Sequence, residues 1–450
     1  MSSRKAIRHL GVALLLALVV AASALAASKS ASTKSAESQV LNVWDYGANP
    51  KVSKAFDSIW RSFEKAHPGV TIKRRSFGGG SDFDTVFTTA MAAGKGPDIW
   101  TATVSSPDTR VSIKRGLVLD LTPYYCKYHW GDKLARNQIG LSTVKDKFYG
   151  VPDGIESLVV FYNKDVFRQL GVTVPKTWAQ LMGIVAKAKA KGLTPISLGN
   201  IEKWPGTQWI SALVANGIGA KGEESLLFGN GHWTQPGVVG ALKRWVELSK
   251  AGAFPKAAIS MSFDEGISLF ARKKAPMFFI GSFVLAGPTA EIFTNPNVGV
   301  FLLPSWNPKI PTQATESSGN GWIVNAKTKN PTLAAEALNY LQFNPASQRI
   351  LFEQVADVLA AKVPNVNSFK VSAQLKQIFA LNNSKRPNNV ALSYLDELIS
   401  VDLGAAIQDD TQALQLGKKD PQQVAAEWDK LWTKARQEGD TLSRTGLPKC

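Results

Sequence analysis

Residues 149–181 read YGVPDGIESLVVFYNKDVFRQLGVTVPKTWAQL, and this stretch carries more information about the fold than any other part of the chain. Residues 149–152 are expected to be extended, because the residue before Pro152 is pushed out of the helical region. The apolar run at residues 157–162 is rich in valine and aromatic residues and predicts a buried strand. The stretch therefore begins as an extended segment that leads directly into a strand.

Two helices are predicted after this strand. Residues 163–165 turn the chain into the first, and Gly171 suits the left-handed position that ends a helix. Thr177 precedes the second helix, where its hydroxyl can accept a hydrogen bond from a free backbone N–H group. Residues 149–181 are thus expected to form one continuous structural unit.

Three short pieces of this unit carry a family resemblance: Tyr-Gly-Val-Pro at 149–152, Tyr-Asn-Lys-Asp at 162–165 and Pro-Lys-Thr-Trp at 175–178. In this order, within about thirty residues, they resemble the extracellular solute-binding proteins of bacterial sugar-import ABC transporters, of the maltose-binding-protein type. In that family the matching segment carries the chain from one lobe into the other. The resemblance implies an α/β fold of two lobes, with a ligand cleft between lobes that a hinge joins.

Other segments on both sides resemble the same family. FEKAHPGVTIK at 63–73 and GKGPDIW at 94–100 precede the unit, and KAPMFFIGSF at 274–283 and SSGNGWIVN at 317–325 follow it. Helical periodicity alternates with short apolar runs throughout, which predicts α/β domains with mostly parallel sheets. The resemblance covers about residues 40–355 and becomes weak beyond them.

The expected domain organisation begins with an export signal. Residues 1–27 combine a basic start, an apolar core and a small-residue cleavage site, as a secretory signal peptide does. Residues 28–39 are expected to be a flexible linker. No cysteine follows the apolar core, so a lipid anchor is not expected; the protein is expected to be periplasmic or secreted, with an uncleaved N-terminal anchor as the alternative. The first lobe is placed at 40–152 and 304–355, and the second at 153–303 and 356–450.

Charge and cysteine content do not indicate a nucleic-acid-binding or zinc-binding protein. The chain has 52 Lys and Arg against 35 Asp and Glu, a formal net charge of +17, but its basic residues are scattered. No basic run alternates with aromatic residues, so a nucleic-acid partner is not expected. Cys126 and Cys450 have no partner at zinc-site spacing, and the sequence leaves open whether they form a disulfide.

Catalytic signatures are not found. The sequence contains no G-x-S-x-G, H-E-x-x-H or P-loop motif. Residues 217–222, GIGAKG, match a dinucleotide fingerprint but follow a predicted helix, where no phosphate cradle would form. The dispersed histidines do not indicate a metal site. We expect a protein that is not an enzyme and needs no cofactor, although paired carboxylates for glycoside hydrolysis stay open.

The 13 tryptophans suggest a carbohydrate ligand, because flat aromatic rings cover the apolar face of a pyranose while polar side chains meet its hydroxyl groups. Core packing is the competing explanation for each of them. For Trp204 and Trp233 both explanations stay open. In α/β sheets ligands bind beyond the carboxyl ends of strands. That rule selects Tyr46, Thr103, Gly281, Ser282, Phe283, Ser318, Gly319 and Asn320.

Two acidic residues complete the predicted ligand-binding set. Asp82 lies in a Gly-rich segment, where it could bind a sugar hydroxyl or cap a helix. Glu156 lies just beyond Pro152, where it could contact the ligand or hold the hinge through a salt bridge. The two roles of each residue stay open.

The resemblance implies high-affinity binding of a carbohydrate outside the cytoplasm and its delivery to the permease of an ABC transporter by hinge closure, by a protein expected to be monomeric. One alternative is the same fold with a non-sugar, phosphorylated or acidic solute, such as glycerol phosphate or a polyamine. A polyamine requires several carboxylates in the cleft, and the selected loops carry few. A secreted glycan-active enzyme is the second alternative.

Overall fold

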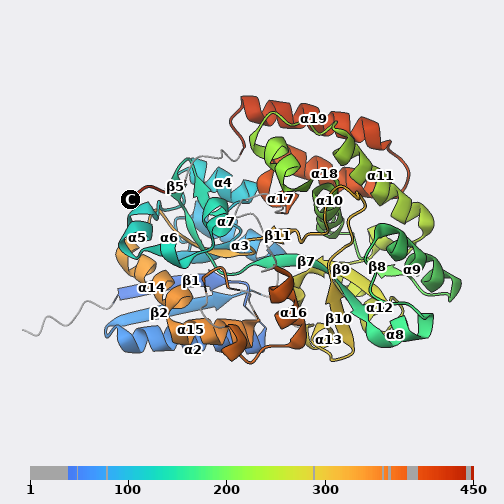
Figure 1. Cartoon of the computed structure of the whole chain (residues 1–450). Coiled ribbons are helices and arrows are strands. Elements are labelled where there is room, and N and C mark those ends of the chain that lie inside the picture. The colour runs from blue at the N-terminus through green and yellow to red at the C-terminus, as the bar shows by residue number, and fades with distance from the viewer. Residues whose placement is uncertain are drawn as a thin grey trace, which may run out of the picture.

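The computed structural model describes residues 39–47, 49–77, 80–286, 289–356, 359–362, 366–382, 394–441 and 447–450. The predicted signal peptide and all of the predicted linker except Gln39 lie outside these residues. The chain forms two lobes side by side, each built around one sheet with helices packed against it (Figure 1). The α/β, two-lobed fold expected from the sequence is confirmed.

The sheet of the first lobe combines strands from three distant parts of the chain. Its order is β2 (Val70–Ser76), β1 (Gln39–Asp45), β3 (Ile99–Ala102), β12 (Gly321–Val324) and β6 (Gly150–Pro152). Strand β1 is parallel to β2 and β3, whereas β12 is antiparallel to β3 and β6. Helix α2 (Pro50–Ala66) begins at Asn49, whose side chain accepts from two backbone N–H groups, and it buries one apolar face, as its periodicity predicts.

The sheet of the second lobe is centred on the strand that enters from the first lobe. Its order is β10 (Val298–Phe301), β7 (Glu156–Asn163), β9 (Met277–Gly281) and β8 (Ile196–Ser197), and β11 (Glu316–Ser317) pairs with the start of β7. Strand β7 is antiparallel to β9, β10 and β11. The prediction of mostly parallel sheets is therefore wrong. Strand β7 arrives directly from the other lobe, without the helical crossover that a parallel neighbour requires.

The unit predicted from residues 149–181 is confirmed. Helix α8 (Lys164–Leu170) has Asn163 as its N-cap and ends at Gly171, which has a φ of 61°. Helix α9 (Trp178–Ala190) begins after Thr177, whose hydroxyl accepts from the backbone N–H of Gln180. Local sequence therefore sets the boundaries of these elements.

The remaining elements cover the two sheets. Against the first lie α3 (Gly80–Ala92), α4 (Pro107–Lys114), α5 (Thr122–Lys127), α6 (Trp130–Lys133), α7 (Arg136–Leu141), the hairpin of β4 (Thr143–Val144) and β5 (Lys147–Phe148), α14 (Pro331–Phe343), α15 (Pro345–Ile350) and η3 (Leu351–Val355). The second carries α10 (Trp204–Phe228), α11 (Pro236–Ala251), η1 (Ala258–Ser260), α12 (Phe263–Ala271), η2 (Ser282–Leu285), α13 (Ala290–Phe293), α16 (Ala373–Asn382), α17 (Leu395–Leu398), α18 (Val401–Gln415) and α19 (Pro421–Gln437); η4 (Val366–Ser368) precedes α16. The GIGAKG segment lies inside α10, not after a strand.

Some segments pack differently from the predicted division into lobes. Residues 304–317 lie along the second lobe, where β11 pairs with β7 and the Trp306 indole donates to the carbonyl of Leu213. Residues 359–361 form bridges to Leu134 and Gly154. These contacts join segments that are far apart in sequence, so local patterns do not reveal them.

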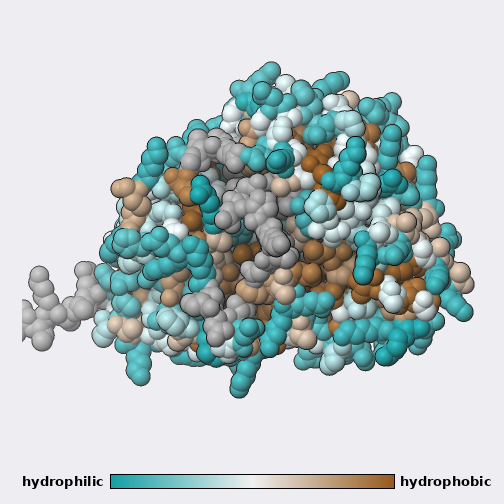
Figure 2. All heavy atoms as spheres, viewed as in Figure 1, coloured by the Kyte–Doolittle hydropathy of each residue, from teal (hydrophilic) through white to brown (hydrophobic). Residues whose placement is uncertain are grey.

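The last described residues return to the first lobe. A disulfide joins Cys450 to Cys126 in α5, with 5.5 Å between the Cα atoms, and Leu447 packs against the hydrophobic cluster that contains Tyr125 of the same helix. Among the described residues, no helix has the length and apolar character needed to cross a membrane. On the face shown in Figure 2, hydrophilic residues dominate, and hydrophobic residues gather in a band from the centre of the view across the second lobe.

Candidate functional site

The carboxyl ends of the first-lobe strands bring three predicted residues to one edge of the sheet. Tyr46 follows β1 and Thr103 follows β3, while Asn320 precedes β12. Trp44 pairs with Trp100, and Ala102 pairs with Gly321, so these loops are neighbours. The half-buried ring of Tyr46 has its centroid 4.7 Å from that of Phe83. In α/β sheets, ligands bind at the edge where the strands end, and this is the edge at which the three residues meet.

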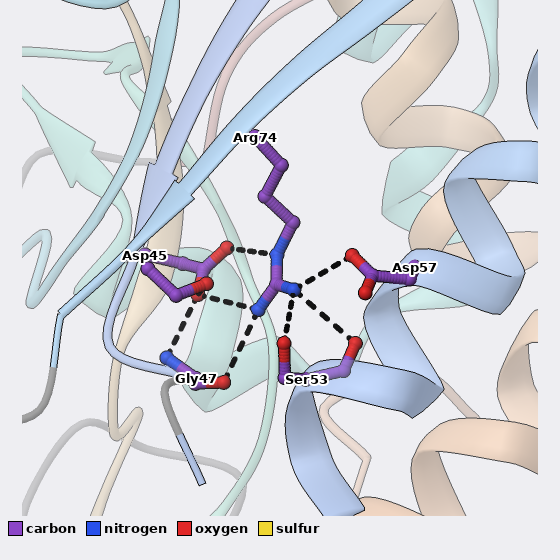
Figure 3. A network of polar contacts seen from close by, with 6 residues as sticks. Asp45, Gly47, Ser53, Asp57 and Arg74 are labelled. Carbon is purple, nitrogen blue, oxygen red and sulfur yellow. Dashed lines mark hydrogen bonds and ion pairs between the residues drawn. The ribbon is translucent and has the colours of Figure 1, made fainter. Parts of the chain in front are cut away.

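A polar network fixes the loop after β1 (Figure 3). The Arg74 guanidinium, on β2, donates to both carboxylate oxygens of Asp45 at 2.6 and 2.8 Å and to Asp57 at 2.9 Å. It also reaches the carbonyl of Gly47, whose N–H donates to Asp45 at 2.7 Å. Burial alone would lower the pKa of Arg74, but the hydrogen bonds and charges of Asp45 and Asp57 raise it. The network holds the turn that carries Tyr46.

The crossing between the lobes places Glu156 against the loop that precedes β12. Ser317 pairs with Glu156 in the β11–β7 ladder. Gly319 has a φ of +57°, and a β-carbon there would lie 3.0 Å from Glu156 Oε1. The backbone N–H of Gly319 donates to the Ser317 hydroxyl at 2.7 Å, and Ser318 is buried. Glu156, Ser318 and Gly319 are therefore brought together.

The second lobe contributes the end of β9 to the same region. Gly281 pairs with Leu158 in β7, and the hydroxyl of Ser282 accepts from the backbone N–H of Ser157 at 3.0 Å. Ser282 is buried and Phe283 is half-buried. These residues follow the carboxyl end of β9, directly beside the start of β7 and hence beside Glu156.

Half-buried aromatic rings form a surface next to the end of β9. The ring of Trp204 has its centroid 4.8 Å from that of Phe263 and 6.0 Å from that of Phe283. We call Trp204, Phe263 and Phe283 the aromatic wall. Phe263 was not selected from the sequence, because it begins a helix with the ordinary pattern of a core-facing element. The wall offers ring surface of the kind that packs on the apolar face of a pyranose.

Trp233 has no surface for a ligand. It is completely buried, and its ring packs edge-on against Trp428 at 5.6 Å and Trp432 at 6.4 Å between centroids. Its backbone N–H donates to Asp429 at 2.7 Å, which closes the loop before α11 onto α19. Trp233 is therefore a core residue, and the prediction that it contacts the ligand is wrong. Asp82 lies in α3, but its side chain is outside the described residues.

A set of acidic residues near the crossing was not selected from the sequence. Glu316 in β11 and Asp396 and Glu397 in α17 join Glu156 around Tyr394. Burial, and then the charges of all four carboxylates, raise the pKa of the Tyr394 hydroxyl. No local signal could have identified this set, because its members come from three segments spread over more than two hundred residues.

Helix α17 contacts both lobes. It packs on α10 of the second lobe and on α4 of the first, and it lies between them in Figure 1. Arg110 of α4 donates to the backbone carbonyls of Glu397, at 3.1 Å, and of Ile399. Burial lowers the pKa of the Arg110 guanidinium to about 10. The carboxylate of Glu397 accepts hydrogen bonds from Ser317 and from Ser105.

Other candidate sites are less well supported. Within the described ranges, no three His, Cys, Asp or Glu side chains are arranged to hold a metal ion. A cavity of about 750 Å³ on the first lobe is lined by Lys133, Phe343, Arg349 and Phe369, and others of about 290 and 320 Å³ lie elsewhere on the lobes. None of these three contains a predicted site residue.

The comparisons with known proteins all identify binding proteins. The family model described as "Bacterial extracellular solute-binding protein" matches residues 45–348. An uncharacterized ABC transporter extracellular-binding protein of Pyrococcus horikoshii is 26% identical over 317 residues, which cover 68% of this chain and 69% of the relative. The "Multiple sugar-binding protein" of Streptococcus mutans is 25% identical over 324 residues, with 68% and 71% covered.

A solved structure shows the same architecture. The one titled "Chitin oligosaccharide binding protein" aligns with a TM-score of 0.76 at 22% identity, and the alignment covers 89% of this chain and all of the other. At this identity the likeness concerns the fold alone. The fold of this chain is therefore that of a known architecture.

Proposed function

Because the chain belongs to the family of bacterial extracellular solute-binding proteins, we propose that it binds a carbohydrate outside the cytoplasm and delivers it to an ABC-type membrane permease. The site lies where the lobes meet, among the ends of β1, β3 and β9, the start of β7 and the loop before β12. The protein acts as a monomer and does not convert its ligand chemically.

The observation that carries this proposal is the pairing of an aromatic wall with a polar rim. Trp204, Phe263 and Phe283 present ring surface, and Glu156 and Asn320, both half-buried, lie on the neighbouring crossing. A pyranose has an apolar face and hydroxyl groups that both donate and accept, so it matches this combination. The printed names of the Streptococcus mutans relative and of a maltodextrin-binding relative in Bacillus subtilis point to the same ligand class.

Hinge bending is the proposed mechanism of capture. The chain passes between the two sheets from β6 to β7 and again from β11 to β12. Rotation about such short connections brings the lobes together on a ligand, and the closed form is what the permease recognises. We propose export by residues 1–27 as a signal peptide, which places the protein in the periplasm or outside the cell.

A panel of saccharides tests the proposal by thermal denaturation. A ligand at one hundred times its dissociation constant is expected to stabilise the protein by about 2.7 kcal/mol, because it binds the folded state alone. The panel covers monosaccharides and oligosaccharides of different linkage, with glycerol phosphate and spermidine as non-saccharide members. Stabilisation by a non-saccharide member alone, or by no member, would contradict carbohydrate binding.

The substitution Trp204→Ala is expected to weaken saccharide binding about ten- to thirtyfold, because it removes the indole, the largest ring system of the aromatic wall. Isothermal titration measures the effect. Trp306→Ala is the matched control: Trp306 is also half-buried in the second lobe, but it packs on α10 and beneath Arg244, away from the crossing. If Trp204→Ala and Trp306→Ala bind the saccharide with equal affinity, Trp204 does not contact the ligand.

A further inference from the structure

Four acidic side chains converge where the lobes meet. Glu156 comes from β7, Glu316 from β11, and Asp396 and Glu397 from α17. Ser317, the neighbour of Glu316, pairs with Glu156 and donates a hydrogen bond to the carboxylate of Glu397, and the charges of all four acids raise the pKa of the Tyr394 hydroxyl. The chain as a whole carries a net charge of +17, so a local surplus of carboxylates is not a consequence of its composition. Their common location calls for a specific explanation.

Three of these groups are almost fully removed from water, whereas Glu156 and Asp396 are half-buried. Glu316 is 8% exposed, Glu397 is 9% exposed and Tyr394 is 3% exposed. Burial of a carboxylate is costly unless an opposite charge or hydrogen bonds compensate for it. Burial raises the pKa of Asp396 to about 6, and burial together with the charge of Asp396 raises the pKa of Glu397. A positive charge placed among them would stabilise their ionised forms.

Two atoms of the cluster have hydrogen-bonding capacity that the described part of the chain does not use. The Tyr394 hydroxyl and Asp396 Oδ1 are both buried and accept or donate no hydrogen bond within it. Arg110 lies beside α17, yet its guanidinium donates to the backbone carbonyls of Glu397 and Ile399. The side-chain carboxylate of Glu397 instead takes hydrogen bonds from two serine hydroxyls.

The cluster does not have the arrangement of a metal site. Among the residues that the structure describes, no group of three acidic, histidine or cysteine side chains could hold a metal ion. An organic ammonium group has different requirements, because its N–H groups donate to separate oxygens in several directions. The Tyr394 hydroxyl and the carboxylates offer such acceptors. The chemistry therefore favours an amine over a metal ion.

The acidic cluster adjoins the aromatic wall. A β-carbon at Gly281 would lie 2.5 Å from the ring of Phe283 and 3.0 Å from the hydroxyl of Tyr394. Gly281 therefore lies between Phe283 of the aromatic wall and Tyr394 of the acidic cluster. The Tyr394 hydroxyl therefore lies beside the aromatic wall.

We propose that the ligand is a saccharide that carries a protonated amine, with its ring against the aromatic wall and its ammonium group held by Asp396, Glu397 and the Tyr394 hydroxyl. The inference rests on the proposed carbohydrate-binding function and specifies its substrate class. The sequence disfavoured a cationic ligand because the loops at the strand ends carry few carboxylates. Helix α17 supplies two further carboxylates, Asp396 and Glu397, so that objection no longer applies.

The test compares matched ligands that differ only in the group at C2 of each sugar ring. Isothermal titration is performed with β-1,4-linked glucosamine oligomers, their N-acetylated counterparts and the corresponding glucose oligomers, and with the same three forms of the galactose and mannose series. The free-amine form of the series that binds is expected to bind ten- to a hundredfold more tightly than its N-acetylated form, because charge-assisted hydrogen bonds are the stronger ones.

Variants then locate the preference. Asp396→Asn and, separately, Glu397→Gln keep the size of the side chain and are expected to reduce the preference to less than threefold, while the affinity for the neutral form is retained. Asp402→Asn is the matched control, since Asp402 is an exposed acid in the next helix, paired with Lys434. Thermal denaturation verifies that each variant is folded, and two independent variants guard against failure of one to fold.

Three outcomes would overturn the inference. Equal or tighter binding of the N-acetylated or neutral forms would reject the ammonium site and leave carbohydrate binding intact. A preference that survives both Asp396→Asn and Glu397→Gln would reject the assignment to α17. If no saccharide of any series binds, whether charged or neutral, the proposed function itself fails and the inference fails with it.

Discussion

Replacement of Arg74 by methionine is expected to lower the free energy of unfolding by about 3–5 kcal/mol. The Arg74 side chain is 8% exposed and that of its partner Asp45 is 1% exposed, so the substitution leaves a buried carboxylate without its counter-charge. Methionine retains most of the hydrophobic length of the side chain, which confines the change to the guanidinium. Denaturant-induced unfolding followed by circular dichroism measures the loss.

A matched control separates this effect from the loss of any arginine. Arg168 pairs with Asp165 but is 77% exposed, so Arg168→Met is expected to change stability by less than about 0.5 kcal/mol. The double variant Asp45→Asn with Arg74→Met should recover part of the loss, since it also removes the unpaired charge. Similar unfolding curves for Arg74→Met and Arg168→Met would show that the network does not stabilise the fold.

Loss of the disulfide is the second large effect. The double variant Cys126→Ser with Cys450→Ser is expected to be about 2–5 kcal/mol less stable than the oxidised protein. The bridge closes a loop with a sequence separation of 324 residues, so its removal frees a large part of the unfolded chain. Unfolding in guanidinium chloride, with and without a reductant, measures the difference.

The reductant supplies the internal control for this prediction. It should lower the stability of the parent protein to that of the double variant and should leave the double variant unchanged. Cys126→Ala with Cys450→Ala should behave like the serine pair, because the effect belongs to the bond and not to the side chain that replaces it. Stability of the parent protein that is insensitive to reduction would contradict the role of the bridge.

Local signals in the sequence predicted the elements around the crossing well. The strand at 157–162, the end of α8 at Gly171 and the N-cap at Thr177 were all predicted and are confirmed. Each depends on side chains within a few residues of the element, such as a hydroxyl that reaches the next turn. The same is true of the apolar face of α2. Both partners of such interactions lie in one short segment, so they can be predicted from the sequence of that segment.

The two selected tryptophans show where local signals end. Trp204 begins α10 and Trp233 lies three residues before α11, and nothing nearby distinguishes them. Trp204 is half-buried in the aromatic wall, whereas Trp233 is sealed by Trp428 and Trp432 from α19. The difference comes from a helix almost two hundred residues later in the chain, which packs on one of them and not on the other.

By itself, the sequence determined the crossing unit and the boundaries of α8 and α9, because these are encoded in short-range patterns of size, polarity and backbone preference. Through its resemblance to a known family it also indicated the two-lobed α/β fold. Only the tertiary structure decided the antiparallel course of β7, the pairing of Cys126 with Cys450, the burial of Trp233 and the convergence of Glu156 and Glu316 with Asp396 and Glu397. Those features depend on which distant segments come into contact. Contact between distant segments is set by the burial of apolar surface summed over the whole chain, and no single stretch of residues contains that sum.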